Sequence, residues 1–435
     1  MERALILHTI QQDNILPLIS NCNAKCLFCS HSGNPPSLKT LSVGIRTLVE
    51  VLQDIVFLDS KRNIIIGESA TRIIEGEPFL YPHIAEVLRT VRETYPHTPI
   101  NITTNGTLLN EEMVCLLAEL GGVEINLSIN AVSSSIHKKL MKNNLTDLQL
   151  DEGLWFHKYN IQFHGSLVAM PWFTGWEEIE LTLRYLQKIG AVTVRIFMPG
   201  YSKYSPEELF FSKAFTEQLR LYVDEIKKSL SIPVLLEPPF LKSLSAEVAG
   251  VLPNSPAEKS GIQYGDTLLL VNGTKVNSRV DAWQSVTKLK NPKINLMRNG
   301  VEYEIIIEKK ANQKSGLICE YDVDWLRVYK LLKYKGKSIL TLTSELALPL
   351  ISLIPVMLSL QHMKVRAVKN ISFGGSIACA GLLTLMDIDA ELGALINIPE
   401  QVLIPSEILD FRGYDLFGEH YSKLEDKYAI KIDII

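Results

Sequence analysis

Three closely spaced cysteines constrain this chain more than any other feature of its sequence. They are Cys22, Cys26 and Cys29, in the spacing C-x3-C-x2-C. Clustered thiolates are soft ligands that select zinc, copper(I) or an iron–sulfur cluster. Four ligands normally close such a site, so an iron–sulfur cluster held by three cysteines keeps one iron open for a small molecule. On spacing alone, a zinc site completed by a fourth ligand such as His31 remains an alternative.

Length and composition indicate a multidomain globular protein. The 435 residues exceed what one hydrophobic core normally organises, so two or three domains are expected. The formal net charge of −4 predicts no nucleic-acid partner. The remaining cysteines, Cys115, Cys319 and Cys379, lie far apart in the sequence. We therefore expect neither a disulfide framework nor a second cluster motif, and we predict a cytoplasmic location.

The segment 338–360 is strongly apolar and nearly long enough to span a bilayer. It contains Glu345, Pro349 and Pro355, which favour a buried strand followed by a helix over a membrane span. The N-terminus shows no cleavage pattern of a signal peptide. No membrane association is therefore expected.

The first half of the chain alternates between strand-like and helix-like segments. Strands are predicted at 15–20, 63–66, 71–74, 100–103, 123–129, 161–169 and 192–198, and helices at 47–57, 83–94, 111–120 and 176–189. The alternation predicts a parallel α/β sheet covered by helices, in which the chemistry lies on loops at the carboxyl ends of the strands.

The cysteine spacing, with Phe28 just before the last cysteine, resembles the cluster motif of the radical S-adenosylmethionine (SAM) superfamily. The resemblance implies a partial (β/α)6 barrel that holds a [4Fe-4S] cluster on Cys22, Cys26 and Cys29, with SAM on the open iron. It implies that SAM is cleaved reductively to methionine and a 5′-deoxyadenosyl radical, which abstracts hydrogen from a substrate. A one-electron reductant such as ferredoxin or flavodoxin would then be a partner.

Gly76, Glu77 and Pro78 follow one of the predicted strands and resemble the Gly-Gly-Glu-Pro motif that holds the SAM ammonium in that superfamily. An ammonium requires carboxylate or carbonyl acceptors, and glycine allows close approach of the backbone. The first glycine of the motif is Glu75 here. Gly-Glu-Pro is also common in ordinary turns.

Two later segments resemble further SAM contacts of the superfamily. Thr104 and Asn105 close the strand at 100–103, although Asn105-Gly106 is equally typical of a tight turn. Ser128 and Asn130 are two residues apart and so share one face of a strand, where the resemblance assigns them to the SAM ribose or carboxylate. Polar residues on an inward strand face are costly without partners, which favours a ligand cavity. Further candidates for the same cavity are Asn126, His164, Ser166 and Arg195.

Residues 241–311 resemble a PDZ domain. The resemblance lies in a Ser-Pro-Ala turn at Ser255, a Gly-Asp turn at Gly265, and turns at Asn272-Gly273 and Asn299-Gly300. Ser255 can cap a short helix, and Asn-Gly predicts a hairpin. The segment 240–244 contains no glycine to form a carboxylate-binding loop, so internal docking is as well supported as peptide binding.

Residues 312–435 resemble the uncharacterised C-terminal domain of PDZ-containing radical SAM proteins, and we expect an α/β domain here. Gly374-Gly375 is interpreted as a tight turn before an apolar strand, with a ligand loop as the alternative. Asp387 and Asp389 are interpreted as a solvated helix start, with a metal pair as the alternative.

Together these features predict a barrel at 1–238, a PDZ-like domain at 241–311 and an α/β domain at 312–435. The predicted function is that of a radical SAM enzyme whose substrate the sequence leaves unidentified, although the PDZ-like domain favours a peptide or protein. The alternative is a non-catalytic PDZ adaptor with a structural zinc or iron–sulfur site.

Overall fold

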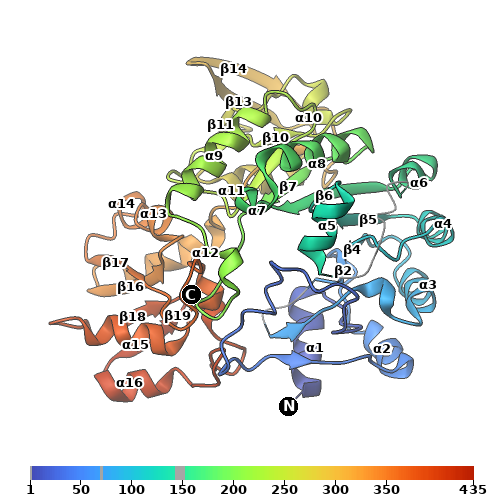
Figure 1. Cartoon of the computed structure of the whole chain (residues 1–435). Coiled ribbons are helices and arrows are strands. Elements are labelled where there is room, and N and C mark those ends of the chain that lie inside the picture. Colours follow the sequence, from blue (N-terminus) through green and yellow to red (C-terminus); the bar gives the residue numbers. More distant parts are fainter. Residues whose placement is uncertain (1, 69–71, 143–151) are drawn as a thin grey trace. The chain divides into compact units, whose positions relative to one another are not determined.

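The computed structural model describes residues 2–68, 72–142 and 152–435 (Figure 1). The chain divides into two compact units. The first comprises residues 1–34, 39–201 and 205–237, and the second comprises residues 35–38, 202–204 and 238–435. The second unit holds both the PDZ-like segment and the C-terminal segment, so the separate boundaries at 241–311 and 312–435 stay predictions.

A six-stranded parallel sheet organises the first unit. Its strands follow one another in chain order: β2 (Ile64–Ile66), β4 (Ile100–Thr104), β5 (Val123–Ser128), β6 (Gln162–Val168), β7 (Val194–Phe197) and β8 (Val234–Glu237). α2 (Leu48–Ile55) precedes this sheet, and the helices between its strands include α3 (Ile84–Thr94), α4 (Glu111–Leu120), α5 (Ser134–Met141), α6 (Glu152–Lys158), α8 (Trp176–Lys188) and α9 (Ala214–Ile226). Figure 1 shows α2, α3, α4 and α6 along one side of this sheet. The predicted partial barrel is confirmed, and α1 (Glu2–Asp13), α9 and β8 are additions that the sequence did not predict.

One strand prediction was wrong. Residues 15–20 make only isolated bridges, Ile15 with Ile65 and Ile19 with Ile45, because Pro17 lacks the N–H that a ladder needs. The strands predicted at 63–66 and 71–74 are present as β2 and β3 (Ile73–Ile74), although residue 71 lies outside the described residues. β2 pairs with β4, and β3 pairs with β1 (Leu41–Ser42).

The strands of the barrel sheet alternate between an apolar face and a polar face. In β5, Ile125 and Leu127 are fully buried, whereas the intervening Asn126 and Ser128 are half-buried. The apolar face lies against the helices: a Cβ atom at Gly165 of β6 would come within 2.9 Å of Leu186 in α8. The opposite face therefore carries polar side chains toward the barrel interior.

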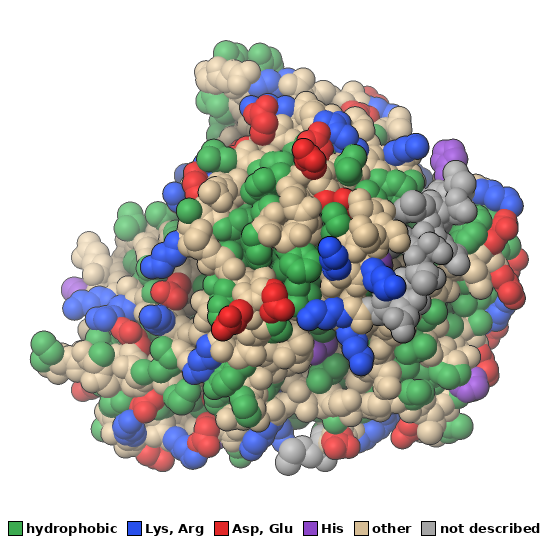
Figure 2. All heavy atoms as spheres, viewed as in Figure 1, with side chains coloured by type: hydrophobic (Ala, Val, Ile, Leu, Met, Phe, Trp, Pro, Cys, Tyr) green, Lys and Arg blue, Asp and Glu red, His purple; other side chains and the backbone are tan. Residues whose placement is uncertain are grey.

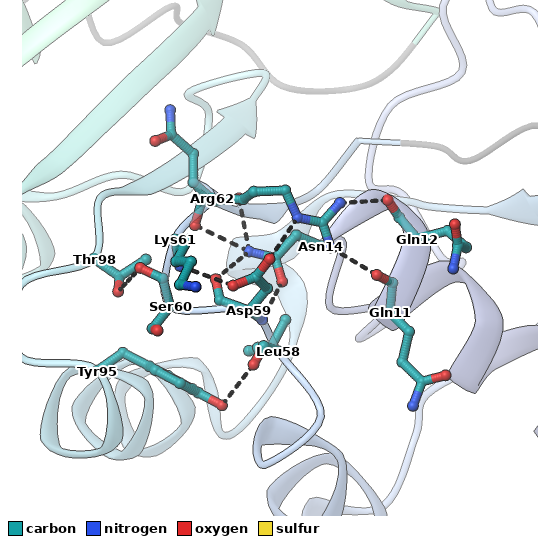
Figure 3. Close-up of polar contacts among 11 residues, drawn as sticks. Gln11, Gln12, Asn14, Leu58, Asp59, Ser60, Lys61, Arg62, Tyr95 and Thr98 are labelled. Atoms are coloured by element: carbon teal, nitrogen blue, oxygen red, sulfur yellow. Dashed lines mark hydrogen bonds and ion pairs between the residues drawn. The ribbon is translucent and has the colours of Figure 1, made fainter. Parts of the chain in front are cut away.

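Asn14 joins helix α1 to the amino edge of this sheet (Figure 3). Its backbone is left-handed, with φ of 57°, as is common just after a helix. Its buried amide nitrogen donates to the carbonyls of Asp59, Arg62 and Asn63, at 3.0 to 3.1 Å. The Arg62 guanidinium donates to the last carbonyls of α1, at Gln11 and Gln12. These contacts lie before β2 begins, at the edge where barrel folds place stability rather than chemistry.

The PDZ-like part of the second unit is built on antiparallel strands. β9 (Ala246–Glu247), β11 (Thr267–Val271), β12 (Thr274–Lys275), β13 (Lys293–Arg298) and β14 (Val301–Ile306) form one sheet, and β10 (Gly250–Val251) pairs with β15 (Leu317–Ile318). Both Asn-Gly hairpins are confirmed, with positive φ at Asn272 and Asn299. Ser255 caps α10 (Pro256–Lys259), as predicted, by accepting from the Glu258 N–H at 3.2 Å.

The glycine-free segment before β9 is bound within the second unit. Leu241 and Leu244 pack into the apolar cluster of the C-terminal part. Arg279, at the start of α11 (Arg279–Lys288), is buried and donates to the Ser243 carbonyl at 2.7 Å. Its backbone N–H donates to the Asp322 carboxylate at 2.8 Å. These contacts fix α11 and the segment before β9 to the C-terminal part.

The C-terminal part is a four-stranded parallel sheet with helices on both faces. The strand order is β17 (Met363–Val368), β16 (Ile339–Ser344), β18 (Gln401–Ile404) and β19 (Lys431–Ile434). α15 (Leu385–Gly393) and α16 (Ser422–Tyr428) pack on one face, and α12 (Trp325–Tyr329), α13 (Leu348–Ile351) and α14 (Ile354–Met357) pack on the other. The α/β prediction is confirmed.

Three details of the C-terminal part differ from the prediction. The single helix expected after β16 is two short ones, because Pro349 and Pro355 each begin a helix. Gly374 and Gly375 do form a positive-φ turn, but no strand follows it, and the chain enters the 3-10 helix at Ala380–Leu382. Asp387 is buried rather than solvated. It accepts from the Thr384 and Ser372 N–H groups, at 2.8 and 2.9 Å.

Acidic and basic side chains are interspersed on the face that Figure 2 shows, in keeping with a formal net charge of −4. Within the described residues, every helix falls short of the length and apolarity that crossing a bilayer requires.

Candidate functional site

The cysteine loop is fixed to the carboxyl end of helix α5. The Lys25 and Leu27 N–H groups donate to the carbonyls of Met141 and Leu140, at 2.9 and 2.7 Å. The Leu27 side chain is only 2% exposed and packs against Leu140 and Met170. Phe28 packs at the margin of the same apolar cluster. These contacts anchor the loop, on which Cys22 is exposed while Cys26 and Cys29 are half-buried.

The three thiols lie near one another in partly desolvated surroundings. Burial, followed by the negative charges of Cys29 and Cys22, raises the pKa of the Cys26 thiol to about 12. Burial also raises the pKa of Cys22. The thiolates therefore repel each other, and a bound cation would be needed to hold them deprotonated near neutral pH. This is the electrostatic behaviour expected of metal ligands in the absence of a metal.

The donor set of the cysteine loop can be compared with what a cluster requires. Among the described residues, no group of three or more His, Cys, Asp or Glu side chains is arranged around a single metal ion. In a cubane cluster each cysteine binds its own iron, so the sulfur atoms need not converge on one point. The donor set of three thiols on one loop therefore fits a [4Fe-4S] cluster.

Gly76 holds the second motif against the cysteine loop. Its N–H donates to the Ile19 carbonyl at 2.7 Å, and the Glu77 N–H donates to the Asn21 carbonyl at 3.0 Å. A Cβ atom at Gly76 would lie 1.8 Å from the Asn21 oxygen, a backbone atom that cannot give way. Glycine is thus required here by the cysteine loop itself, a reason that the sequence did not reveal.

Glu77 connects the second motif to the end of β4. Its buried carboxylate accepts from the Thr104 hydroxyl at 2.6 Å, the Asn105 N–H at 2.8 Å and the Phe79 N–H at 3.3 Å. Burial raises the pKa of Glu77, and these three donors oppose that rise. A carboxylate offers about four acceptor sites, so about one remains for a ligand. Pro78 is buried directly after it.

Asn105 reaches back from the end of β4 to the cysteine loop. Its amide nitrogen donates to the Asn23 side-chain oxygen at 3.0 Å and lies 3.8 Å from the Cys22 sulfur. The Asn23 amide in turn donates to the Thr107 hydroxyl at 2.9 Å. Sequence reasoning missed Asn23 and Thr107. Both lie within or beside the motifs, but nothing in the sequence pairs them.

A row of polar side chains crosses the inner face of the sheet. The hydroxyls of Ser128 and Ser166 lie 3.0 Å apart, on neighbouring strands in register. The Asn126 amide donates to the Thr103 hydroxyl at 3.3 Å and accepts from Arg195 at 3.4 Å. The His164 ring contacts Thr193 at 2.7 Å. The structure thus joins the predicted polar positions of β5, β6 and β7 in one half-buried surface.

Asn130 lies apart from that row. It follows the end of β5, is 6% exposed, and accepts from the Val168 N–H at 2.8 Å, so it joins the ends of β5 and β6.

A carboxylate that sequence reasoning missed is the buried Glu178. It accepts from the Val132 and Ser133 N–H groups, both at 2.7 Å, and holds the start of α5. Glu178 thus positions α5, the helix whose carboxyl end accepts the hydrogen bonds of the cysteine loop.

Glu75, which replaces the first glycine of the superfamily motif, is buried behind the site. Its carboxylate accepts from the Leu18 N–H at 3.5 Å. Burial raises the pKa of Glu75 to about 8, although Leu18 and Arg46 oppose the rise. The substitution therefore adds a buried acid beneath the segment that leads into the cysteine loop.

Family models match two parts of the chain. Residues 16–209 match the radical SAM superfamily, and residues 247–297 match the PDZ domain. The first match covers the cysteine loop and every element of the site described above.

Curated relatives and solved structures match part of the chain. The GTP 3′,8-cyclase of Microcystis aeruginosa is 27% identical over 128 residues, which are 29% of this chain and 37% of that protein. The GTP 3′,8-cyclase of Vibrio atlanticus is 28% identical over 186 residues, or 39% and 52% of the two chains. The chain thus spans about half or less of the length of these relatives. Streptococcus suis SuiB bound to its precursor peptide SuiA aligns with a TM-score of 0.40 and 16% identity, over 54% of this chain and 53% of that one.

The radical SAM superfamily binds a [4Fe-4S] cluster and SAM, and the cysteine loop, the sheet order and the family matches agree with one another. The chain therefore carries a radical SAM domain at residues 16–209 and a PDZ domain at residues 247–297.

Proposed function

We propose that this chain is a radical SAM enzyme that acts on a peptide or protein in the cytoplasm. The observation that best supports the proposal is that hydrogen bonds link three motifs that are separate in the sequence. The Glu77 N–H bonds to Asn21 beside the cysteines, the Glu77 carboxylate bonds to Asn105, and the Asn105 side chain returns to Asn23. Thr104 and Asn105 end β4 at the carboxyl edge of the six-stranded sheet, and these hydrogen bonds hold the other two motifs to that edge, where barrel enzymes place their chemistry.

In this proposal Cys22, Cys26 and Cys29 hold the [4Fe-4S] cluster as thiolates. When bound, the cluster and SAM supply the one-electron cleavage of the sulfonium to methionine and a 5′-deoxyadenosyl radical, which takes hydrogen from the substrate. An external reductant such as ferredoxin or flavodoxin would deliver the electron. Cys22 is exposed on the loop, which keeps this side of the site accessible.

The remaining residues would bind and orient SAM. The SAM ammonium would use the acceptor site that Glu77 retains, together with backbone carbonyls of Gly76 and Pro78. Thr104 and Asn105 would keep that carboxylate in place, and the Asn105 amide would stay beside the cysteine loop. The paired Ser128 and Ser166 hydroxyls would receive the ribose hydroxyls. Asn130 and Phe28 would support the strand end and the loop.

The experiment is anaerobic reconstitution of the full chain with iron and sulfide. The wild-type chain should hold one [4Fe-4S] cluster, and alanine at Cys22, Cys26 or Cys29 should remove or cripple it. Cys115→Ala is the matched control, because Cys115 lies on α4 outside the loop and should leave the iron content unchanged. Stoichiometric zinc without iron after careful anaerobic preparation would contradict the proposal.

The peptide substrate is supported by the PDZ domain at 247–297. It can be tested by following deuterium. Incubation with the peptide fraction of cells grown on deuterated amino acids should transfer deuterium into 5′-deoxyadenosine. Transfer from the small-metabolite fraction alone would argue for a free metabolite instead.

A further inference from the structure

The C-terminal sheet carries a cavity that the proposed chemistry does not use. The cavity has a volume of about 480 Å³ and lies on one face of β16, between that strand and the helices α12, α13 and α14. Its apolar lining includes Ile351, Ile354, Met363 and Pro405. Cavities of roughly 300–1,000 Å³ with mostly apolar walls and a few polar groups are typical small-molecule sites.

The strand order places this cavity where open parallel sheets commonly bind ligands. β16 comes first in the chain, β17 lies on one side of it, and β18 lies on the other. Connections that leave a central strand in opposite directions open a crevice at the carboxyl ends of the strands. Ala347 after β16 and Ser406 after β18 both line the cavity, which therefore extends to that crevice.

Thr341 provides an independent sign of a ligand. Leu340 and Leu342 pack with α15 and α16, so alternation along β16 directs Thr341 to the opposite face, where the cavity lies. Thr341 is 3% exposed, and its hydroxyl has no hydrogen-bond partner among the described residues. A buried hydroxyl without a partner is unfavourable, and valine would fill the same space without that cost.

The charges around the mouth favour an anion. Three carboxylates line the cavity, and each is already engaged. Glu407 pairs with Arg327 at 2.9 Å, Asp324 accepts from the Leu326 N–H at 2.9 Å, and Asp322 accepts from two N–H groups of α11. Lys330 and Lys333 also line the cavity and are exposed, and the Lys333 ammonium lies 4.7 Å from the centre of the Tyr334 ring. Neither lysine forms an ion pair with a carboxylate of the described residues, so both ammonium groups are open to an anion.

We propose that this cavity binds a small, largely apolar organic anion. The apolar part would lie among Ile351, Ile354 and Met363, a polar atom of the ligand would bond to the Thr341 hydroxyl, and the negative charge would face Lys330 and Lys333. This site does not use the cluster. Its test is therefore independent of the proposed enzyme activity.

The test uses the full chain and two fluorescent probes of similar shape. Anilinonaphthalene sulfonate is an apolar anion, and phenylnaphthylamine is its neutral counterpart. The anion should bind one-to-one and at least tenfold more tightly than the neutral probe. Ala347→Leu, which narrows the cavity, should weaken binding of the anion at least tenfold, whereas Ala390→Leu on the exposed side of α15 should not.

Two further variants keep the test decisive if Ala347→Leu fails to fold. Thr341→Val should weaken binding of the anion severalfold. The double change Lys330→Ala and Lys333→Ala should weaken the anion but not the neutral probe, while Lys364→Ala, an exposed control on β17, should change neither. Absence of binding, binding that none of the cavity variants alters, or equal affinity for both probes would overturn the proposal.

Discussion

The two parallel sheets of this protein place polar side chains on a strand face in different ways. In the barrel sheet the polar residues bond to one another across strands, as Ser128 does with Ser166 and Asn126 does with Thr103. In the C-terminal sheet Thr341 is buried on β16 with no such partner among the described residues. The first arrangement is a polar surface beside three loop motifs, and the second is a buried hydroxyl without a partner in a cavity with a largely apolar wall. In our proposals, two sheets of the same architecture would support two different kinds of ligand site.

The largest effect should come from breaking the contact between the motifs in the barrel. Gly76→Ala would force a Cβ atom against the Asn21 carbonyl, where it would lie 1.8 Å from the oxygen. We expect destabilisation of about 3 kcal/mol or more, because backbone must move, together with loss of the cluster. Chemical denaturation and iron analysis would measure both.

Gly381→Ala is the control for that change. A Cβ atom there would lie 3.9 Å from the nearest atom outside the neighbouring residues, and it belongs to the C-terminal part. If Gly76→Ala and Gly381→Ala both changed stability and iron content only slightly and to the same extent, Gly76 would not be a contact point for the cysteine loop.

The buried acid behind the site should make the stability of the barrel depend on pH. Because burial raises the pKa of Glu75 to about 8, the folded chain retains a proton that the unfolded chain has already lost above its ordinary value of 4.5. The free energy of unfolding should therefore fall as pH rises from 4.5 to 8, by up to about 5 kcal/mol at about 1.4 kcal/mol per pKa unit.

Glu75→Gln should remove that part of the pH dependence and stabilise the chain above pH 8. The exposed Glu86→Gln on α3 serves as a control for loss of charge. Denaturation at several pH values would measure the effect, and identical pH profiles for wild type and Glu75→Gln would refute the account of this residue.

Smaller effects should follow from single contacts to SAM. Glu77→Gln should weaken SAM binding while the cluster remains, because the glutamine side chain keeps its size but loses the charge that would face the ammonium. Ser128→Ala should weaken binding by about 1–3 kcal/mol, the value of one buried hydrogen bond. Equilibrium binding of SAM to the reconstituted protein would measure both, and unchanged affinity in both variants would remove these residues from the SAM site.

The two sheets also differ in how much their sequence revealed. The cysteine spacing and the Gly-Glu-Pro and Thr-Asn-Gly segments are each contiguous in the sequence and resemble motifs of one superfamily, so a common site for them could be predicted. The cavity of the C-terminal sheet could not, because its lining comes from single residues such as Thr341, Met363 and Ser406 on separate elements. Asn23 and Thr107 were missed for the same reason, since a pairing between distant amides and hydroxyls leaves no sequence pattern. Glu75 was recognised as a departure from the motif, but its burial depends on how Leu18 and Arg46 pack around it.

The smallest effect is expected at the PDZ domain. Arg279 bonds the start of α11 to Ser243, and Asp322 bonds to the same helix end, so this region is held within the second unit. We expect no binding of free C-terminal peptides at micromolar affinity, which corresponds to about −8 kcal/mol. A peptide-library screen that returned a clear C-terminal consensus at that affinity would overturn this expectation.

The central claim is that the barrel edge binds a cluster and SAM together and uses them for radical chemistry. The most direct measurement is the formation of 5′-deoxyadenosine by anaerobically reconstituted protein with SAM and a strong one-electron reductant. The account predicts slow formation of 5′-deoxyadenosine and methionine even without substrate, and none after Cys26→Ala. An intact, reducible cluster that neither binds SAM nor forms 5′-deoxyadenosine would contradict it.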